Sequence, residues 1–365
     1  MTPSTGLLTI NLSAIANNWQ RLNEALGPKV DCAAVVKANA YGLGVVPVAR
    51  ALYARGCRHF FVASLDEAVE LRSCLDTSVP IFVFGGLVHG LGTEWQNDNL
   101  IPVLCDIVHI EQWLNYCQQH HQQLPCIIKI DTGMHRLGVL PNELIDFVHR
   151  LPASSALSVV YLLSHLACAD EPEHPQNTLQ LDRFRQVTQA LSAHRLSPSL
   201  SLANSSGIFL GEDYHFDLAR PGAALYGVNP TPGKANPMEP VVTLELPVMQ
   251  CRNIAAGESV GYGATYTAEK PTRLATVFGG YGDGLFRCLS NLGQAYCAEQ
   301  LVSLVGRVSM DSMVFDIGNL SEDPKTLQFL NARQDVNQVA KHANTIAYEV
   351  LTNLGQRYRR RYIEN

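Results

Sequence analysis

The sequence lacks the features that would place the protein in a membrane or in an oxidising compartment. No apolar run approaches the length of a membrane-spanning helix, and the first ten residues lack the basic and apolar regions of a signal peptide. The ten cysteines, scattered from Cys32 to Cys297, include no Cys-x-x-Cys pair. This distribution is typical of reduced core residues and not of a disulfide framework or a zinc site. These absences predict a soluble, globular protein of the cytoplasm with no metal centre and no membrane partner.

The sequence also has no block of basic residues in its body, and its formal net charge is −6. A mildly acidic protein of this kind is unsuited to nucleic acid as its main partner. The basic residues at 357–361 are interpreted as a solvated C-terminal tail. Several enzyme signatures are missing as well: there is no Walker loop, no His-Glu-x-x-His, no Gly-x-Ser-x-Gly and no strand-linked dinucleotide fingerprint.

What the sequence does contain is a regular succession of short apolar runs. Its 365 residues, 47% of them hydrophobic, are enough for two domains. Eight runs are predicted strands, at 32–36, 59–63, 80–84, 101–104, 126–130, 159–163, 199–202 and 217–219. Amphipathic helical patterns separate most of them, at 47–55, 66–75, 107–120, 142–150 and 176–194. This alternation favours an N-terminal (β/α)8 TIM barrel, although the weak third and seventh crossovers leave a doubly wound sheet open.

The composition changes near residue 230. A cluster of Pro, Gly and Asn at 229–237 is typical of a linker. Beyond it lie β-rich runs at 241–251, 273–278, 301–308 and 313–317, and one helical pattern at 335–354. Near the N-terminus, an extended piece at 9–12 precedes a helix for which Ser13 is the predicted cap. We therefore predict a barrel over 10–232 and a smaller, mostly β domain over 233–365, joined by the segment 1–9.

The barrel prediction gathers polar residues at one place. Active sites of this fold lie at the C-terminal ends of the strands. The residues just past the predicted runs include Lys37, Asp131, His165, Ser205 and Arg220. Burial at a strand end would lower the pKa of Lys37 and make its amine a nucleophile, whereas a lysine that extends to solvent would be an ordinary surface residue.

The run VVKANAYG at 35–42 resembles the pyridoxal-phosphate attachment motif of the alanine racemases. Further motifs of this family follow in order: IDTGMHRLG at 130–138, GESVGYGATY at 257–266, YGDG at 281–284 and GRVSMD at 306–311, the last with serine where cysteine is common. The resemblance covers nearly the whole chain. It implies that Lys37 carries pyridoxal 5'-phosphate covalently and that Arg220, supported by His165, faces the pyridine nitrogen. The phosphate would be held by Tyr41, Asn204, Ser205, Gly222 and Ala223.

The same resemblance implies the substrate side of the site. Arg136 would bind the substrate carboxylate, supported by Lys129, whose counterpart in the family is often carbamylated. Tyr262 would be the second base, and Tyr281, Met310 and Asp311 would lie near the substrate. Tyr262, Met310 and Asp311 would come from the partner subunit of a homodimer with shared active sites. The C-terminal phosphate tyrosine of the family is replaced by Gln356, and Tyr358 is the nearby alternative.

The resemblance thus predicts interconversion of L-alanine and D-alanine by two bases, supplying D-alanine for peptidoglycan. Lys37 would exchange the proton on the D-alanine face and Tyr262 on the L-alanine face. Three alternatives stay open. The first is a related enzyme, either a serine or broad-specificity racemase or a basic amino-acid decarboxylase. The second is a non-catalytic barrel protein that binds the cofactor, although such carriers lack a second β domain. The third is a barrel protein without cofactor.

Overall fold

The structure is a computed structural model, and it describes residues 5–88, 90–152, 155–193 and 196–364. The chain forms two compact units. The barrel unit comprises Ile15–Ala40 and Gly44–Met238. The β unit comprises the chain up to Ala14, the short piece Tyr41–Leu43 and the chain from Glu239 on. Residues 1–4 of the predicted joining segment, His194 at the end of a predicted helix and Asn365 lie outside the described residues.

The strands of the barrel unit follow one another around a ring in chain order. Seven parallel strands form one sheet in consecutive order: β3 (Ala34–Val35), β4 (Phe60–Val62), β5 (Ile81–Val83), β6 (Leu100–Leu104), β7 (Pro125–Lys129), β8 (Ser158–Leu163) and β9 (Ser199–Ser201). The eighth strand, β10 (Leu218–Ala219), is parallel to β2 (Asp31–Cys32). The backbone N–H of Asp217 donates to the carbonyl of Leu200 in β9, and that of Arg220 donates to the carbonyl of Ala203 just after β9, so β10 closes the ring. All eight predicted strands and the barrel are confirmed, and the doubly wound alternative is wrong because the strand order never reverses.

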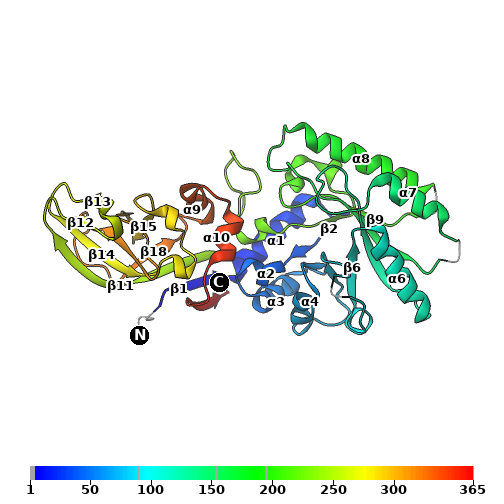
Figure 1. Ribbon diagram of the computed structural model, residues 1–365, viewed down its shortest axis with the longest axis horizontal. Coiled ribbons are helices and arrows are strands. Elements are labelled where there is room, and N and C mark those ends of the chain that lie inside the picture. The colour runs from blue at the N-terminus through cyan, green and yellow to red at the C-terminus, as the bar shows by residue number, and fades with distance from the viewer. Residues whose placement is uncertain (1–4, 89, 153–154, 194–195, 365) are drawn as a thin grey trace. The chain divides into compact units, whose positions relative to one another are not determined.

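Helices surround these strands, as Figure 1 shows. They are α1 (Leu12–Leu26), α3 (Val45–Arg55), α4 (Leu65–Arg72), α5 (Glu94–Asn97), α6 (Ile107–Gln119), α7 (Pro141–Arg150) and α8 (Pro175–Ser192). The two crossovers that lacked a helical pattern contain only the short α5 and the 3-10 turns η1 (Gly207–Leu210) and η2 (Glu212–Tyr214). Segments this short cannot display a helical period, which is why the sequence did not reveal them.

The start of the first helix differs from the prediction. The backbone N–H of Ala14 donates to Oδ1 of Asn11 at 3.0 Å, and α1 already begins at Leu12. The cap is therefore Asn11, the last residue of β1 (Leu7–Asn11), and not Ser13. An asparagine at this position satisfies an N–H of the first helical turn as well as a serine does.

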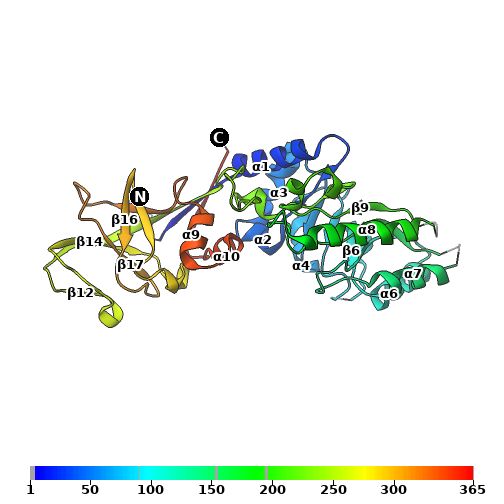
Figure 2. The same cartoon turned by 90° about the horizontal axis from the view of Figure 1, so that it is seen from above.

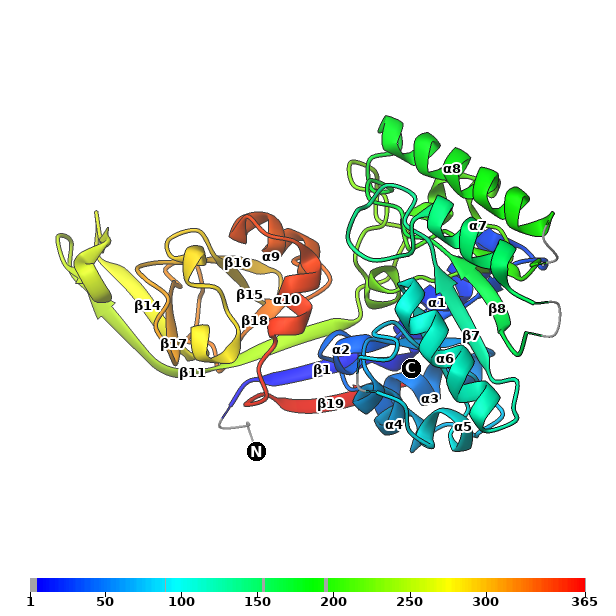
Figure 3. The ribbon, with the colours of Figure 1, turned by 45° about the vertical axis from the view of Figure 1, so that its right-hand side comes forward.

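The β unit is built on one eight-stranded sheet that partly closes on itself. Its order is β14 (Thr272–Phe278), β17 (Ser312–Asp316), β16 (Gln300–Leu304), β15 (Gln294–Cys297), β18 (Thr326–Leu330), β11 (Val242–Ile254), β1 and β19 (Arg359–Ile363). The long strand β11 also pairs with β14, aided by a register shift between Val248 and Gln250. In Figure 3, β1, β11 and β19 lie side by side along one edge. A hairpin of β12 (Ser259–Val260) and β13 (Tyr266–Thr267) extends from the unit.

The C-terminal part of the chain corrects two predictions. Residues 359–363 form β19, parallel to β1, so the interpretation of 357–361 as a solvated tail is wrong. The predicted helix at 335–354 is two helices, α9 (Val336–Ala343) and α10 (Ala347–Asn353), which lie side by side in Figure 2. Asn344, at a φ of 52°, ends the first of them in the left-handed conformation that asparagine tolerates. Within the described ranges, no helix has the length and apolar character needed to cross a membrane.

Candidate active site

Lys37 lies at the C-terminal end of the first barrel strand, where the backbone takes an unusual course. It opens α2 (Lys37–Tyr41), in which Ala38, Asn39, Ala40 and Tyr41 have φ values of 53°, 54°, 54° and 54°. We call residues 38–41 the left-handed turn. Each L-residue in this conformation costs about 1–2 kcal/mol, so the surrounding structure must hold it. The turn begins with a hydrogen bond from Ala40 N to Val36 O, 2.8 Å long.

The amine of Lys37 is set up as a nucleophile. The residue is half-buried, and its Nζ lies 5.9 Å from the centre of the Phe84 ring. Burial lowers the pKa of Lys37, and the nearby Arg136 lowers this pKa further, against an opposing effect of Glu67. A lower pKa increases the fraction of neutral amine, which is the reactive form. This environment favours the nucleophile interpretation over a solvated surface lysine.

Four cationic side chains gather around His165 at the same end of the barrel. Burial lowers the pKa of His165 well below its usual value, and Arg220, Lys129, Arg136 and Lys37 lower it further, in that order. The imidazole is therefore neutral at physiological pH. Lys129, at the end of β7, is only 8% exposed, and burial lowers its pKa as well. Such a concentration of positive charge suits an anionic ligand.

Arg220 is held by hydrogen bonds to residues at the C-terminal ends of β8 and β9. Its side chain is buried and donates to the hydroxyl of Ser201, to the carbonyl of Ser164 at 2.5 Å and to that of Leu202 at 3.4 Å. Burial lowers the pKa of Arg220 to about 9, which leaves the guanidinium charged at neutral pH. Among the described residues, no hydrogen bond joins His165 to Arg220. The supporting role of His165 thus stays a prediction.

A serine hydroxyl organises the neighbouring turn. Ser205 Oγ accepts hydrogen bonds from the backbone N–H groups of Gly222 (3.0 Å) and Ala224 (3.2 Å). The hydrogen of this hydroxyl is not used in these two bonds and can be donated to an anion. Asn204 Oδ1 accepts a hydrogen bond from Gly207 N at 2.9 Å, which stabilises the turn at 204–207 that contains Ser205. Ala223 opens the 3-10 turn η3 (Ala223–Tyr226). Small residues with backbone N–H groups at strand ends suit a phosphate.

The loop after β7 presents Arg136 with an exposed side chain. Asp131 Oδ1 accepts from three backbone N–H groups of this loop, at 2.8, 3.0 and 3.1 Å. The buried side chain of Gln180, in α8, forms a hydrogen bond to this loop. Its amide nitrogen donates to Thr132 Oγ1 (3.2 Å) and His165 O (2.9 Å), and its oxygen accepts from Ala167 N (2.9 Å). One glutamine thereby links the segments that carry Arg136 and His165, and no local sequence signal marked it.

Replacement of Gln180 by methionine tests this link. Methionine keeps the length of the side chain but leaves the buried groups of Thr132, His165 and Ala167 without their partner. We expect the free energy of unfolding to fall by at least about 2 kcal/mol, because buried polar groups without partners are costly. Urea unfolding of the full chain measures this change. Gln189→Met, exposed on the same helix, is the matched control. Equal midpoints for the two variants would contradict the role of Gln180.

The remaining predicted residues lie in the β unit. Tyr262 begins the 3-10 turn η4 (Tyr262–Ala264) and is 74% exposed, and Tyr281 and Met310 are also exposed. The loops of Tyr281 and Met310 are tied together, since Tyr281 N donates to Ser309 O (3.0 Å) and Gly282 N to Met310 O (2.9 Å). Tyr41 is buried beside the ring of Tyr348, and this burial raises its pKa, so the phenol is neutral. Thus Tyr281 and Met310 form one exposed group.

Arg357 links the loop of Tyr281 to the loop of Met310 through two carboxylates. Its guanidinium makes two bonds to the fully buried carboxylate of Asp283, at 2.7 and 2.9 Å, and a third to Asp311 Oδ1 at 2.7 Å. Asp311, predicted to lie near the substrate, therefore has its carboxylate engaged by Arg357. Tyr358 is buried against Gly6, and its hydroxyl lacks a partner among the described residues, whereas Gln356 is exposed. The hydroxyl of Tyr358 is thus enclosed within the β unit.

Comparison with known proteins shows which family shares these two domains. The model of the alanine racemase N-terminal domain matches residues 10–230, and that of the alanine racemase C-terminal domain matches residues 241–362. The chain belongs to the alanine racemase family. Alanine racemase of Rhodospirillum rubrum is 44% identical, covering 98% of this chain and 96% of its own length. "Alanine racemase, catabolic" of Agrobacterium fabrum is also 44% identical, covering 99% and 93%. Membership makes this chain an enzyme of the isomerase class.

Solved alanine racemases share the fold along the full length of the chain. The Bartonella henselae enzyme, solved with covalently bound pyridoxal phosphate, has a TM-score of 0.92 at 40% identity and covers 99% of this chain and 100% of its own. The enzyme of Streptomyces coelicolor A3(2) has the same TM-score at 32% identity, covering 99% and 98%. These matches agree with the barrel and the mostly β unit described above.

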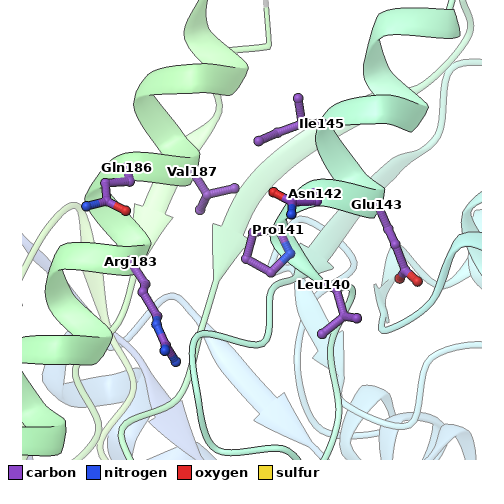
Figure 4. A pocket seen from close by; sticks show the side chains of 8 residues that line it. All are labelled: Leu140, Pro141, Asn142, Glu143, Ile145, Arg183, Gln186 and Val187. Carbon is purple, nitrogen blue, oxygen red and sulfur yellow. The ribbon is translucent and has the colours of Figure 1, made fainter.

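A surface groove between α7 and α8 is separate from the residues assigned by this resemblance to the alanine racemases. Figure 4 shows side chains of the two helices directed toward it. Its lining residues are Leu140, Pro141, Asn142, Glu143, Ile145, Arg183, Gln186 and Val187. None of them is a predicted site residue. Arg183 nevertheless reaches the Arg136 loop, because its guanidinium donates to Thr132 O at 3.2 Å.

Proposed function

We propose that this protein interconverts L-alanine and D-alanine with pyridoxal 5'-phosphate as its cofactor, through two bases, Lys37 and Tyr262. One observation carries the proposal. The lysine with a lowered pKa, the charged and buried Arg220 and the Ser205 turn all lie at the C-terminal ends of strands of a single barrel. This set supplies a nucleophile, a fixed donor and an anion site, which are the groups needed to hold a phosphorylated pyridine aldehyde.

The residues present fit this cofactor. Lys37 would hold it covalently, and the phosphate would lie at the Ser205 hydroxyl, with Tyr41, Asn204, Gly222 and Ala223 around it. When bound, pyridoxal phosphate acidifies the Cα–H bond of an amino acid by delocalising the electron pair that is left behind. The charged guanidinium of Arg220 has N–H donors but no acceptor atom. It therefore favours an unprotonated partner nitrogen, which restrains side reactions that need a stronger electron sink.

Protons would be moved at Cα by two side chains on opposite faces. Lys37, once its amine is free, exchanges the proton on the D-alanine face, and Tyr262 does so on the L-alanine face. A neutral phenol is a poor proton acceptor, and a cation such as Arg136 beside it would stabilise the phenolate form that accepts the proton. Arg136 also suits the substrate carboxylate, because its planar guanidinium can make two parallel bonds to it.

Three further groups complete the substrate side in this proposal. Lys129, buried beside the positive charges of Arg136 and Arg220, would support Arg136. Addition of carbon dioxide to its neutral amine, with release of one proton to solvent, would form a carbamate whose oxygens can accept from those arginines. Tyr281 and Met310 would bound the space for the methyl group of alanine. Asp311 would act by fixing the Met310 loop through its bond to Arg357.

We infer that the active form is a homodimer whose two sites each combine residues of both chains. Tyr262, Tyr281 and Met310 are exposed by 74%, 45% and 55% in the single chain, although all three are large apolar or aromatic residues that a functional site would cover. A partner chain that received them would complete its site with Tyr262. The ten cysteines, all present as free thiols, suit the reducing cytoplasm as the place of action.

Conversion of L-alanine to D-alanine by the purified protein tests the proposed function. We expect racemisation of alanine, a smaller rate with serine and no release of carbon dioxide from basic amino acids. Lys129→Met should raise the KM for alanine, because Arg136 loses its support. Growth of a D-alanine-requiring bacterium that expresses the protein would show that the product supplies peptidoglycan. Cofactor binding without any change of alanine would favour a carrier, and faster reaction with serine would overturn the assigned substrate.

A further inference from the structure

One carboxylate connects the end of the Lys37 strand to the end of the neighbouring strand. Glu67 Oε1 accepts a hydrogen bond from the backbone N–H of Ala38, and its Oε2 accepts one from Ala63 N, both at 2.7 Å. Ala38 directly follows Lys37, and Ala63 follows β4, which pairs with β3 in register. Each oxygen of the carboxylate therefore holds one of two adjacent strand ends.

The backbone at Ala38 needs such a partner. Ala38 is the first residue of the left-handed turn, at φ 53° and ψ 47°, a conformation that an alanine does not adopt by local preference. Its N–H donates to the carboxylate of Glu67 and not to a carbonyl of the neighbouring strand. The later part of the turn has partners of its own, since Gly44 N donates to Asn39 O (2.9 Å) and Val45 N to Asn39 Oδ1 (2.7 Å).

Glu67 is itself well anchored. It lies in the first turn of α4, and its backbone N–H donates to the side chain of Ser64, the N-cap of that helix, at 3.3 Å. The carboxylate thus projects from the start of a helix, where negative charge is favourable. Glu67 also opposes the effect of Arg136 on the charge of Lys37, which places it within electrostatic reach of the amine.

We propose that Glu67 is a positioning residue for Lys37: its carboxylate fixes the left-handed turn that aims the lysine amine at the site. The proposal rests on the proposed function of Lys37. Glu67 touches the backbone beside the lysine and not the reacting atoms. Its effect is to keep the amine in one orientation, and small errors of orientation at a reacting group are costly to rate.

The test compares Glu67→Ala and Glu67→Gln with Glu70→Gln, a control that is exposed on the same helix. Alanine removes both acceptors. Glutamine keeps one acceptor oxygen but turns an NH2 group toward the second N–H. Hydrogen exchange of the full chain, followed by mass spectrometry, reports peptides that cover residues 36–43 and 60–67. We expect faster exchange in both peptides for Glu67→Ala and an intermediate effect for Glu67→Gln, with no change for Glu70→Gln.

Kinetics give the second readout. We expect kcat for alanine to fall by roughly 100-fold in Glu67→Ala, with the KM almost unchanged because Arg136 lies on a different loop. A purely structural role would lower the melting temperature but leave kcat intact well below it, and that result would overturn the proposal. Unchanged exchange at 36–43 in folded Glu67→Ala would overturn it too. Failure of the proposed function is recognised separately, because the wild-type chain would then not racemise alanine.

Discussion

Lys37→Ala is expected to abolish racemisation and the visible absorbance of bound cofactor. In the proposed mechanism the substitution removes both the covalent attachment and the base for one face of the substrate, so we expect a loss of more than about 1000-fold in kcat. The fold should persist, because Lys37 is half-buried and its strand is held by neighbours on both sides. Activity in both directions and the absorbance spectrum of the purified variant measure the effect.

Lys29→Ala is the matched control, since Lys29 is exposed and lies outside the strands of the barrel. It should retain the activity and the spectrum of the wild-type chain. A Lys37→Ala protein that still racemises alanine at an appreciable rate would show that another amine does the chemistry. Added methylamine should restore part of the rate to Lys37→Ala if the missing group is a base of the right kind.

Tyr262→Phe is expected to keep the cofactor and lose the reaction. Phenylalanine preserves the ring and removes only the hydroxyl, so the loss reports proton transfer, which contributes about 100- to 10,000-fold in enzymes of this kind. Racemisation is expected to fall in both directions, because the proposed mechanism uses both bases in each direction. Tyr266→Phe, on the same hairpin, is the control and should stay active. Equal activity of Tyr262→Phe and the wild-type chain would remove Tyr262 from the mechanism.

Mixing the two inactive variants tests the shared site. If Tyr262 acts in the partner's site, a dimer of one Lys37→Ala chain and one Tyr262→Phe chain has one intact site and one doubly defective site. Random exchange of subunits should then restore about a quarter of the wild-type activity, because half of the dimers are mixed and half of their sites are intact. If each site were built within one chain, mixing would restore nothing. A fully active monomer in size-exclusion chromatography would also contradict the dimer.

Much of the fold could be predicted from the sequence because its signals are local. The eight short strands of the barrel unit were visible as buried apolar runs, and the barrel followed from their alternation with helices. The motif around Lys37 was visible for the same reason, since the strand end, the lysine and the glycines are contiguous. The C-terminal part was harder: β15 and β18 were not recognised, and the arginines at 359–361 gave no sign that they form an edge strand.

The sequence by itself therefore determined the strands of the barrel, the family to which the chain belongs and the end of the strands at which Lys37 and its neighbours lie. Only the tertiary structure decided which groups hold these residues by hydrogen bonds. Glu67 bonds to the left-handed turn after Lys37, Gln180 bonds to the loop that carries Arg136, and Ser164 and Ser201 bond to Arg220. The physical reason is that a strand or helix is encoded by the spacing of near neighbours, whereas these hydrogen bonds join residues that lie far apart in the chain. Such a contact exists only once the barrel has closed.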